Sequence, residues 1–121
     1  MRTSLRLTAR VMSAVLLCMS FSLQAAVPDG SARALHLLGY IGADYPRTVA
    51  AGQVIDAAEY QEQLEFLGVL QKLLAGLPDQ PGREKLQQDL QQLHAAVSQR
   101  QDGPLVASQA RRLAAALVEL Y

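Results

Sequence analysis

Apolar residues recur every three or four positions along four stretches of this 121-residue chain, and no other feature restricts the fold as much. Positions three and four apart lie on one face of an α-helix, so each stretch predicts a helix with one apolar side. Short Gly- and Pro-containing segments separate the stretches, which makes successive helices antiparallel neighbours. The sequence therefore predicts an all-α fold, a small up-and-down helical bundle of about four helices. The four apolar stripes are Leu35, Leu38, Ile41 and Tyr45; Tyr60, Leu64, Leu67, Leu70 and Leu74; Leu86, Leu90, Leu93 and Val97; and Val106, Ala110, Leu113, Leu117 and Leu120.

The ends of the helices carry capping signals. The second helix has the clearest start, because Asp56 is followed three residues later by Glu59, a variant of the capping box. We expect this helix to run to about Ala75, before Gly76 and Pro78. The other expected starts are a position near Ser31 for the first helix, Asp79 and Pro81 for the third, and Asp102 with Pro104 for the fourth.

The segment between the first two long helices contains a second helix signal. Pro46 suits the first turn of a short helix and Gly52 suits its end. Residues 53–55, Gln-Val-Ile, are then expected to form a brief extended connector.

Residues 1–26 have the three parts of a secretory signal peptide. A basic start with Arg2, Arg6 and Arg10 precedes an apolar run over 11–23, and Ala25 or Ala26 supplies the small residue before cleavage. The alternative is an uncleaved anchor, but the apolar run is shorter than the roughly 20 residues of a membrane span. The expected domains are therefore a signal peptide, 1–26, and a periplasmic helical domain, 27–121.

Export changes the composition of the mature protein. Cys18 lies inside the signal, so the mature chain can form no disulfide, thiolate metal site or thioether-linked haem. Without Arg2, Arg6 and Arg10 it has 8 basic and 11 acidic residues, a net charge of −3. This charge favours no nucleic acid partner. No later segment approaches the length and hydropathy of a membrane span.

The mature chain also lacks the motifs of common enzyme classes. It has no nucleophile elbow around its serines, no glycine-rich phosphate loop and no HExxH sequence. We therefore expect a protein that is not an enzyme.

Acidic residues are concentrated early in the mature chain and form a candidate metal site. Asp44, Glu59 and Glu62 could bind a metal together with His36, because imidazole and carboxylate are a chemically sensible ligand set for iron. The simpler alternative is that the acids stabilise the start of a helix by interacting with its dipole, and that they form a solvated face. In that alternative His36 is a partly buried structural histidine. His94 has no acidic cluster near it in sequence and is expected at the surface.

Two segments, "HLLGYIGADYP" over 36–46 and "AAGQVIDAAEYQEQLEF" over 50–66, carry a family resemblance. They resemble the periplasmic N-terminal extension of bacterial high-affinity iron permeases, in which a soluble helical segment precedes the membrane permease, often with a c-type cytochrome domain between them. The resemblance implies that the first segment ends one helix, starts another and packs against the second segment. The matching positions are His36, Leu37, Leu38, Tyr40, Asp44, Tyr45, Pro46, Gly52, Val54, Glu59, Tyr60, Glu62 and Phe66.

This chain also departs from those permeases. Gly39 stands where they commonly have an acidic residue, which removes one candidate ligand, and the mature chain has neither a CxxCH sequence nor a membrane span. The resemblance implies a non-catalytic periplasmic module associated with iron uptake, with iron as its metal and a membrane iron permease or a c-type cytochrome as its partner. The alternatives are a stand-alone periplasmic metal-binding protein and a truncated fragment with no independent function.

Overall fold

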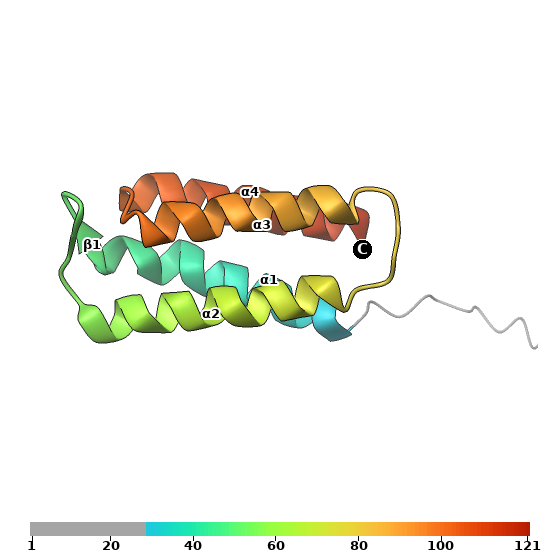
Figure 1. Cartoon of the computed structure of the whole chain (residues 1–121), viewed down its shortest axis with the longest axis horizontal. Coiled ribbons are helices and arrows are strands. Elements are labelled where there is room, and N and C mark those ends of the chain that lie inside the picture. Colours follow the sequence, from blue (N-terminus) through green and yellow to red (C-terminus); the bar gives the residue numbers. More distant parts are fainter. Residues whose placement is uncertain (1–28) are drawn as a thin grey trace, which may run out of the picture.

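The structure, a computed structural model, describes residues 29–121, so the expected signal peptide lies outside the described residues. Four long helices run alternately up and down, and each contacts the next, while α1 and α4 close the ring (Figure 1). This arrangement confirms the predicted all-α bundle. In chain order the elements are α1 (Asp29–Asp44), the 3₁₀-helix η1 (Tyr45–Arg47), β1 (Val49–Ala50), β2 (Gln53–Val54), α2 (Ala57–Ala75), α3 (Arg83–Ser98) and α4 (Gly103–Leu120).

The apolar stripes meet in one continuous core. The stripe of α3 is buried in full, as the spacing predicts, whereas the stripes of α1, α2 and α4 each contain residues that are only half-buried at one end. Burial of this apolar area supplies the main free energy of folding. The core residues of largest volume include Tyr45, Leu38, Ile41, Leu67, Leu70, Leu74, Leu93 and Leu117.

Most of the expected helix ends are confirmed, with three corrections. Asp56 caps α2 and accepts a 3.0 Å hydrogen bond from the backbone N–H of Glu59. Helix α1 begins two residues earlier than expected, at Asp29. Helix α3 begins later than expected, at Arg83, because Gly82 and not Asp79 occupies its N-cap. Asp102 occupies the N-cap of α4, but its side chain makes no capping hydrogen bond.

The third correction concerns the connection between α1 and α2. Pro46 does lie in the first turn of a short helix, η1, but Gly52 does not end that helix. Gly52 belongs to the turn of a small antiparallel hairpin, in which Val49 pairs with Val54 and Ala50 pairs with Gln53. Ala51 and Gly52 have positive φ angles of 50° and 74°, as a two-residue type I′ turn requires. The expected extended connector is thus a paired strand.

Tyr45 and Tyr60 join the hairpin end of the bundle to the last turn of α3 and to the turn that follows it. The Tyr45 side chain is fully buried, and its hydroxyl donates a 2.6 Å hydrogen bond to the backbone carbonyl of Gln101. The Tyr60 hydroxyl donates a 2.9 Å bond to the carbonyl of Val97. Burial raises the pKa of Tyr45 to about 12, with smaller contributions from Tyr60 and Asp102.

The same end of the bundle contains a close approach of two backbones. A Cβ atom added to Gly103, the first residue of α4, would lie 2.6 Å from the Cα of Pro46 in η1. Only glycine fits at this position without displacing one of the two segments. The contact between η1 and α4 therefore depends on the absence of a side chain at one residue.

Helix α2 buries one polar side chain inside the apolar core. Gln63 is fully buried, and neither its amide nitrogen nor its amide oxygen has a hydrogen-bond partner among the described residues. A buried amide without partners is costly, so Gln63 weakens the bundle relative to an apolar residue of similar size. Among the described residues, no helix is both long and apolar enough to cross a membrane.

Candidate functional site

The four residues of the predicted metal site lie on α1 and on the first half of α2. His36 is exposed on α1, so the expectation of a partly buried histidine is wrong. Asp44 is the last residue of α1, half-buried, with its carboxylate 3.5 Å from the guanidinium of Arg47. Glu59 and Glu62 are exposed in the first two turns of α2.

An aromatic pair defines how α1 and α2 are aligned. The rings of Tyr40 and Phe66 lie with their centroids 5.9 Å apart and their planes at 34°. The two helices run in opposite directions (Figure 1), so the residue one turn after Tyr40 lies level with the residue one turn before Phe66. These residues are Asp44 and Glu62. The structure therefore brings Asp44 and Glu62 to the same height on neighbouring helices, each about 6 Å along the axis from the aromatic pair.

His36 lies on the other side of the aromatic pair. It precedes Tyr40 by one turn, whereas Glu59 precedes Phe66 by two turns on the antiparallel helix. With about 1.5 Å of rise per residue, His36 and Glu59 are separated by roughly 16 Å along the bundle axis. One metal ion cannot bridge that separation, because its ligands lie about 2 Å from it.

The other possible metal ligands among the described residues lead to the same conclusion. Between 29 and 121, no three His, Cys, Asp or Glu side chains are grouped so that they could hold a metal ion. Any metal bound at Asp44, Glu59 and Glu62 would therefore need further ligands from solvent or from a partner. Metal binding by these residues stays a prediction.

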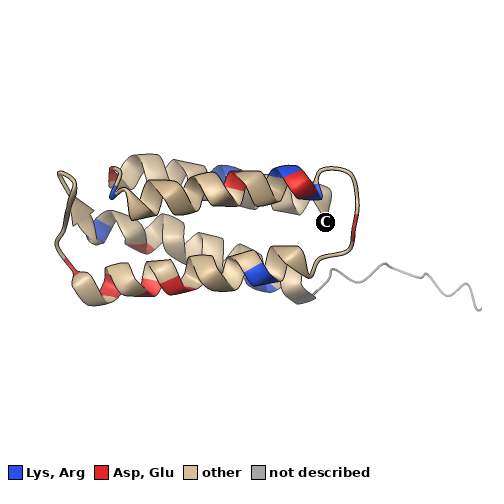
Figure 2. Cartoon of the chain, in the orientation of Figure 1, with Lys and Arg blue, Asp and Glu red and all other residues tan. Residues whose placement is uncertain are grey.

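The first half of α2 is a strongly acidic surface. Figure 2 shows acidic positions gathered there, and the sequence has no Lys or Arg between Arg47 and Lys72. Neither Glu59 nor Glu62 belongs to an ion pair with another described residue; the three ion pairs are Arg47–Asp44, Arg83–Asp79 and Lys85–Asp89. The carboxylates of α2 are thus available to a cationic ligand or partner.

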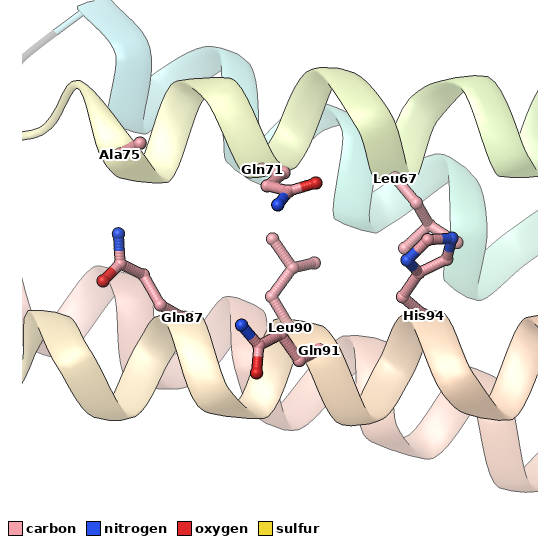
Figure 3. Close-up of a pocket in the computed structure, with 7 residues that line it drawn as sticks. All are labelled: Leu67, Gln71, Ala75, Gln87, Leu90, Gln91 and His94. Atoms are coloured by element: carbon pink, nitrogen blue, oxygen red, sulfur yellow. The ribbon is translucent and has the colours of Figure 1, made fainter.

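A second candidate feature is a pocket between α2 and α3. The pocket has a volume of about 240 Å³, and the side chains that line it come from both helices (Figure 3). The lining contains no carboxylate, so this pocket offers amide and imidazole groups but none of the acidic ligands predicted for iron. The lining residues are Leu67, Gln71, Ala75, Gln87, Leu90, Gln91 and His94.

Sequence reasoning placed His94 at the surface but missed its neighbours. His94 is exposed, as expected, yet it lies at this pocket together with Gln87 and Gln91. Spacings of four and three along α3 put these residues on one flank of the helix, and that periodicity could have indicated a shared polar surface. The partners on α2 could not be recognised in the same way, because they depend on how the two helices are aligned.

The residues that carry the family resemblance divide into two groups in space. Tyr45, Pro46 and Tyr60 join the hairpin end to α3 and α4. The contact between the rings of Tyr40 and Phe66 confirms that the first segment packs against the second. His36, Tyr40 and Glu62 lie on the outer surface. The first group explains stability, and the second is free to contact something outside the bundle.

Comparison with known protein families gives a match over most of the chain. The family model described as the iron permease-associated 4-helix bundle domain matches residues 24–121. No curated protein matches the chain, and no solved structure does.

Proposed function

Because this chain belongs to the family of iron permease-associated 4-helix bundle domains, we propose that it is a non-catalytic periplasmic module that serves iron uptake. It acts outside the membrane, either by contacting a permease or by presenting carboxylates to iron. The family supports the link to iron uptake, and the signal-like residues 1–26 support the periplasmic location.

The acidic surface of α2 is the observation that carries the proposal. Glu59 and Glu62 are exposed, and no ion pair within the described residues neutralises them. Asp44 lies level with Glu62 on the neighbouring helix and adds a third carboxylate at this end of the bundle. Hydrated iron ions and basic segments of a partner are both attracted to such a surface.

Iron uptake by cells tests the proposal directly. Deletion of the gene should slow the uptake of radioactive iron under iron limitation, and the intact gene should restore it. A variant with Asp44→Ala, Glu59→Ala and Glu62→Ala should fail to restore uptake although it folds. The matched control removes three exposed acids elsewhere, Asp79, Glu84 and Glu119, and should restore uptake. Normal uptake in the deletion strain contradicts the proposal.

A second candidate is a stand-alone metal-binding protein, favoured by the three carboxylates at one end of α1 and α2. Calorimetric titration of the purified protein should then show affinity for iron or copper, which the Asp44, Glu59 and Glu62 variant loses and the control variant keeps. His36→Ala should leave the affinity unchanged, because His36 lies roughly 16 Å from Glu59 along the bundle. Absence of binding at micromolar metal excludes this candidate and leaves contact with a partner.

The truncated-fragment alternative makes a different prediction. A fragment without an independent role should be poorly stable, whereas a functional module should unfold in one cooperative transition. Calorimetry of the purified protein distinguishes the two, since a sharp transition excludes an unstable fragment.

A further inference from the structure

Helix α1 separates two unlike surfaces on the outside of the bundle. On the side toward α2, Tyr40 is 51% exposed and stacks against Phe66, so the two rings form an aromatic ridge. Glu62 lies one turn before Phe66 on the same flank of α2. The ridge is therefore apolar at its centre and acidic at one end.

On the side toward α4, the surface is a shallow apolar groove. It is lined by Leu35, Gly39 and Ala114, with the stem of Arg111 at one end, and it has a volume of about 370 Å³. A Cβ atom added to Gly39 would meet no atom within 4 Å, so the groove is open at this residue. Val118 continues the same flank of α4 one turn beyond Ala114 and is 61% exposed.

The charged residues beside the ridge and the groove occupy similar heights along the bundle. Arg111 is level with Gly42 of α1, because a Cβ atom at Gly42 would lie 4.0 Å from the Cγ of Arg111. Glu62 is level with Asp44, two residues farther along α1, so the backbone positions of Glu62 and Arg111 differ by only about 3 Å in height. Neither Glu62 nor Arg111 forms an ion pair with another described residue.

We propose that this face binds a second copy of the chain, in a symmetric dimer whose two-fold axis runs parallel to α1. Rotation by 180° about that axis exchanges the α2 flank and the α4 flank of α1, while every residue keeps its height along the bundle. The ridge of each copy therefore meets the groove of the other. Tyr40 then packs over Gly39 and Ala114 of the second copy, and Glu62 faces its Arg111. If the two-fold axis instead ran perpendicular to the helices, the acidic flank of each copy would face the acidic flank of the other. Repulsion between like charges would disfavour that arrangement.

The first test asks whether the protein associates and whether the groove is responsible. Protein expressed from the complete sequence should show a concentration-dependent monomer–dimer equilibrium in analytical ultracentrifugation. Gly39→Gln should make it monomeric, because the new side chain fills the groove. The same variant should raise the thermal midpoint of the monomer, since it removes a glycine from a helix interior. Gly68→Gln is the matched control, because Gly68 is also unobstructed but lies on another flank of α2, and it should still dimerise.

The second test addresses the paired charges. Glu62→Arg and Arg111→Glu should each weaken the dimer by about two- to thirtyfold, because the symmetric dimer contains this exposed ion pair twice, and the double variant should recover the lost affinity. The proposal is wrong if the wild-type protein is a monomer at every concentration. It is also wrong if the Gly39→Gln variant still forms a dimer. Failure of the double variant to recover overturns the orientation of the axis. Because Glu62 belongs to both proposals, the Gly39→Gln variant separates them. It removes the dimer and keeps every carboxylate, so normal iron uptake by this variant would leave the proposed function standing without the dimer.

Discussion

The Tyr45 hydroxyl donates a hydrogen bond to the backbone carbonyl of Gln101, 56 residues farther along the chain, and the bond length is 2.6 Å. Tyr45 follows α1 directly, and Gln101 lies in the turn before α4. The bond thus ties the end of the first helix to the start of the last, in a part of the bundle where Pro46 also packs against Gly103 and Tyr60 bonds to Val97.

Tyr45→Phe should remove this bond and leave the Gln101 carbonyl without its partner. We expect the free energy of unfolding to fall by about 1–3 kcal/mol, the usual cost of a buried polar group that loses its partner. Chemical denaturation followed by circular dichroism measures the change. Tyr121→Phe is the control, because its hydroxyl donates an exposed bond to the Pro78 carbonyl and should matter less.

Tyr45 should also make stability depend on pH in alkaline solution. Burial raises its pKa from 10.0 to about 12, so between these values the unfolded chain loses the proton while the folded protein keeps it. The folded state then binds more protons, and stability falls as the pH rises through this window. Denaturation at a series of alkaline pH values should show a steeper fall for the wild type than for Tyr45→Phe. Parallel curves would contradict the raised pKa.

Gln63→Leu should stabilise the protein. Gln63 is fully buried with no partner for its amide, and leucine of similar size avoids the cost of an unpaired buried polar group. We expect a gain of about 1–3 kcal/mol in the free energy of unfolding. Gln61→Leu, at an exposed position of the same helix, should change stability by less than about 0.5 kcal/mol. A loss of stability in Gln63→Leu would show that the amide does make a hydrogen bond in solution.

Gly103→Ala and Gly39→Ala should have opposite effects. At Gly103 the new methyl group would lie 2.6 Å from the Pro46 Cα, so we expect a loss of about 1–3 kcal/mol from overpacking. At Gly39 the methyl group meets no atom within 4 Å, so a gain of roughly 0.5–1 kcal/mol from helix propensity should follow. Thermal unfolding of the two variants gives the comparison. A gain at Gly103 would contradict the close approach, and a loss at Gly39 would contradict the open space beside that residue.

Arg100→Gly should also stabilise the protein. Helix α3 ends with bonds from the N–H of Arg100 to the Val97 carbonyl and from the N–H of Gln101 to the Ala96 carbonyl, the pattern of a Schellman motif. Arg100 occupies its left-handed position with a φ of 55°, where a side chain is strained by about 1–3 kcal/mol. The variant should recover part of this strain, as measured by chemical denaturation. Arg100→Ala, which keeps the strained Cβ atom, should not.

Local pattern was sufficient for the helices themselves. The stripe Leu86, Leu90, Leu93 and Val97 predicts the buried face of α3, and Asp56 predicts the first residue of α2, because helical periodicity and capping depend on residues within about one turn. The hairpin was not predicted, and the reason is also local. Its strands are only two residues long, and Ala51 stands where a type I′ turn favours Asn or Asp.

The candidate sites depended on how one helix lies against another. Regular spacing could place His36 on α1 and Glu59 on α2, but only the packing of Tyr40 against Phe66 decides that they lie at different heights. Gln63 falls in the apolar core for the same reason, since its burial depends on the neighbouring helices. Spacing along a chain determines the face of a helix on which a residue lies. The height and closeness of two helices are determined by the interlocking of side chains that are distant in sequence, and here only the tertiary structure shows that interlocking.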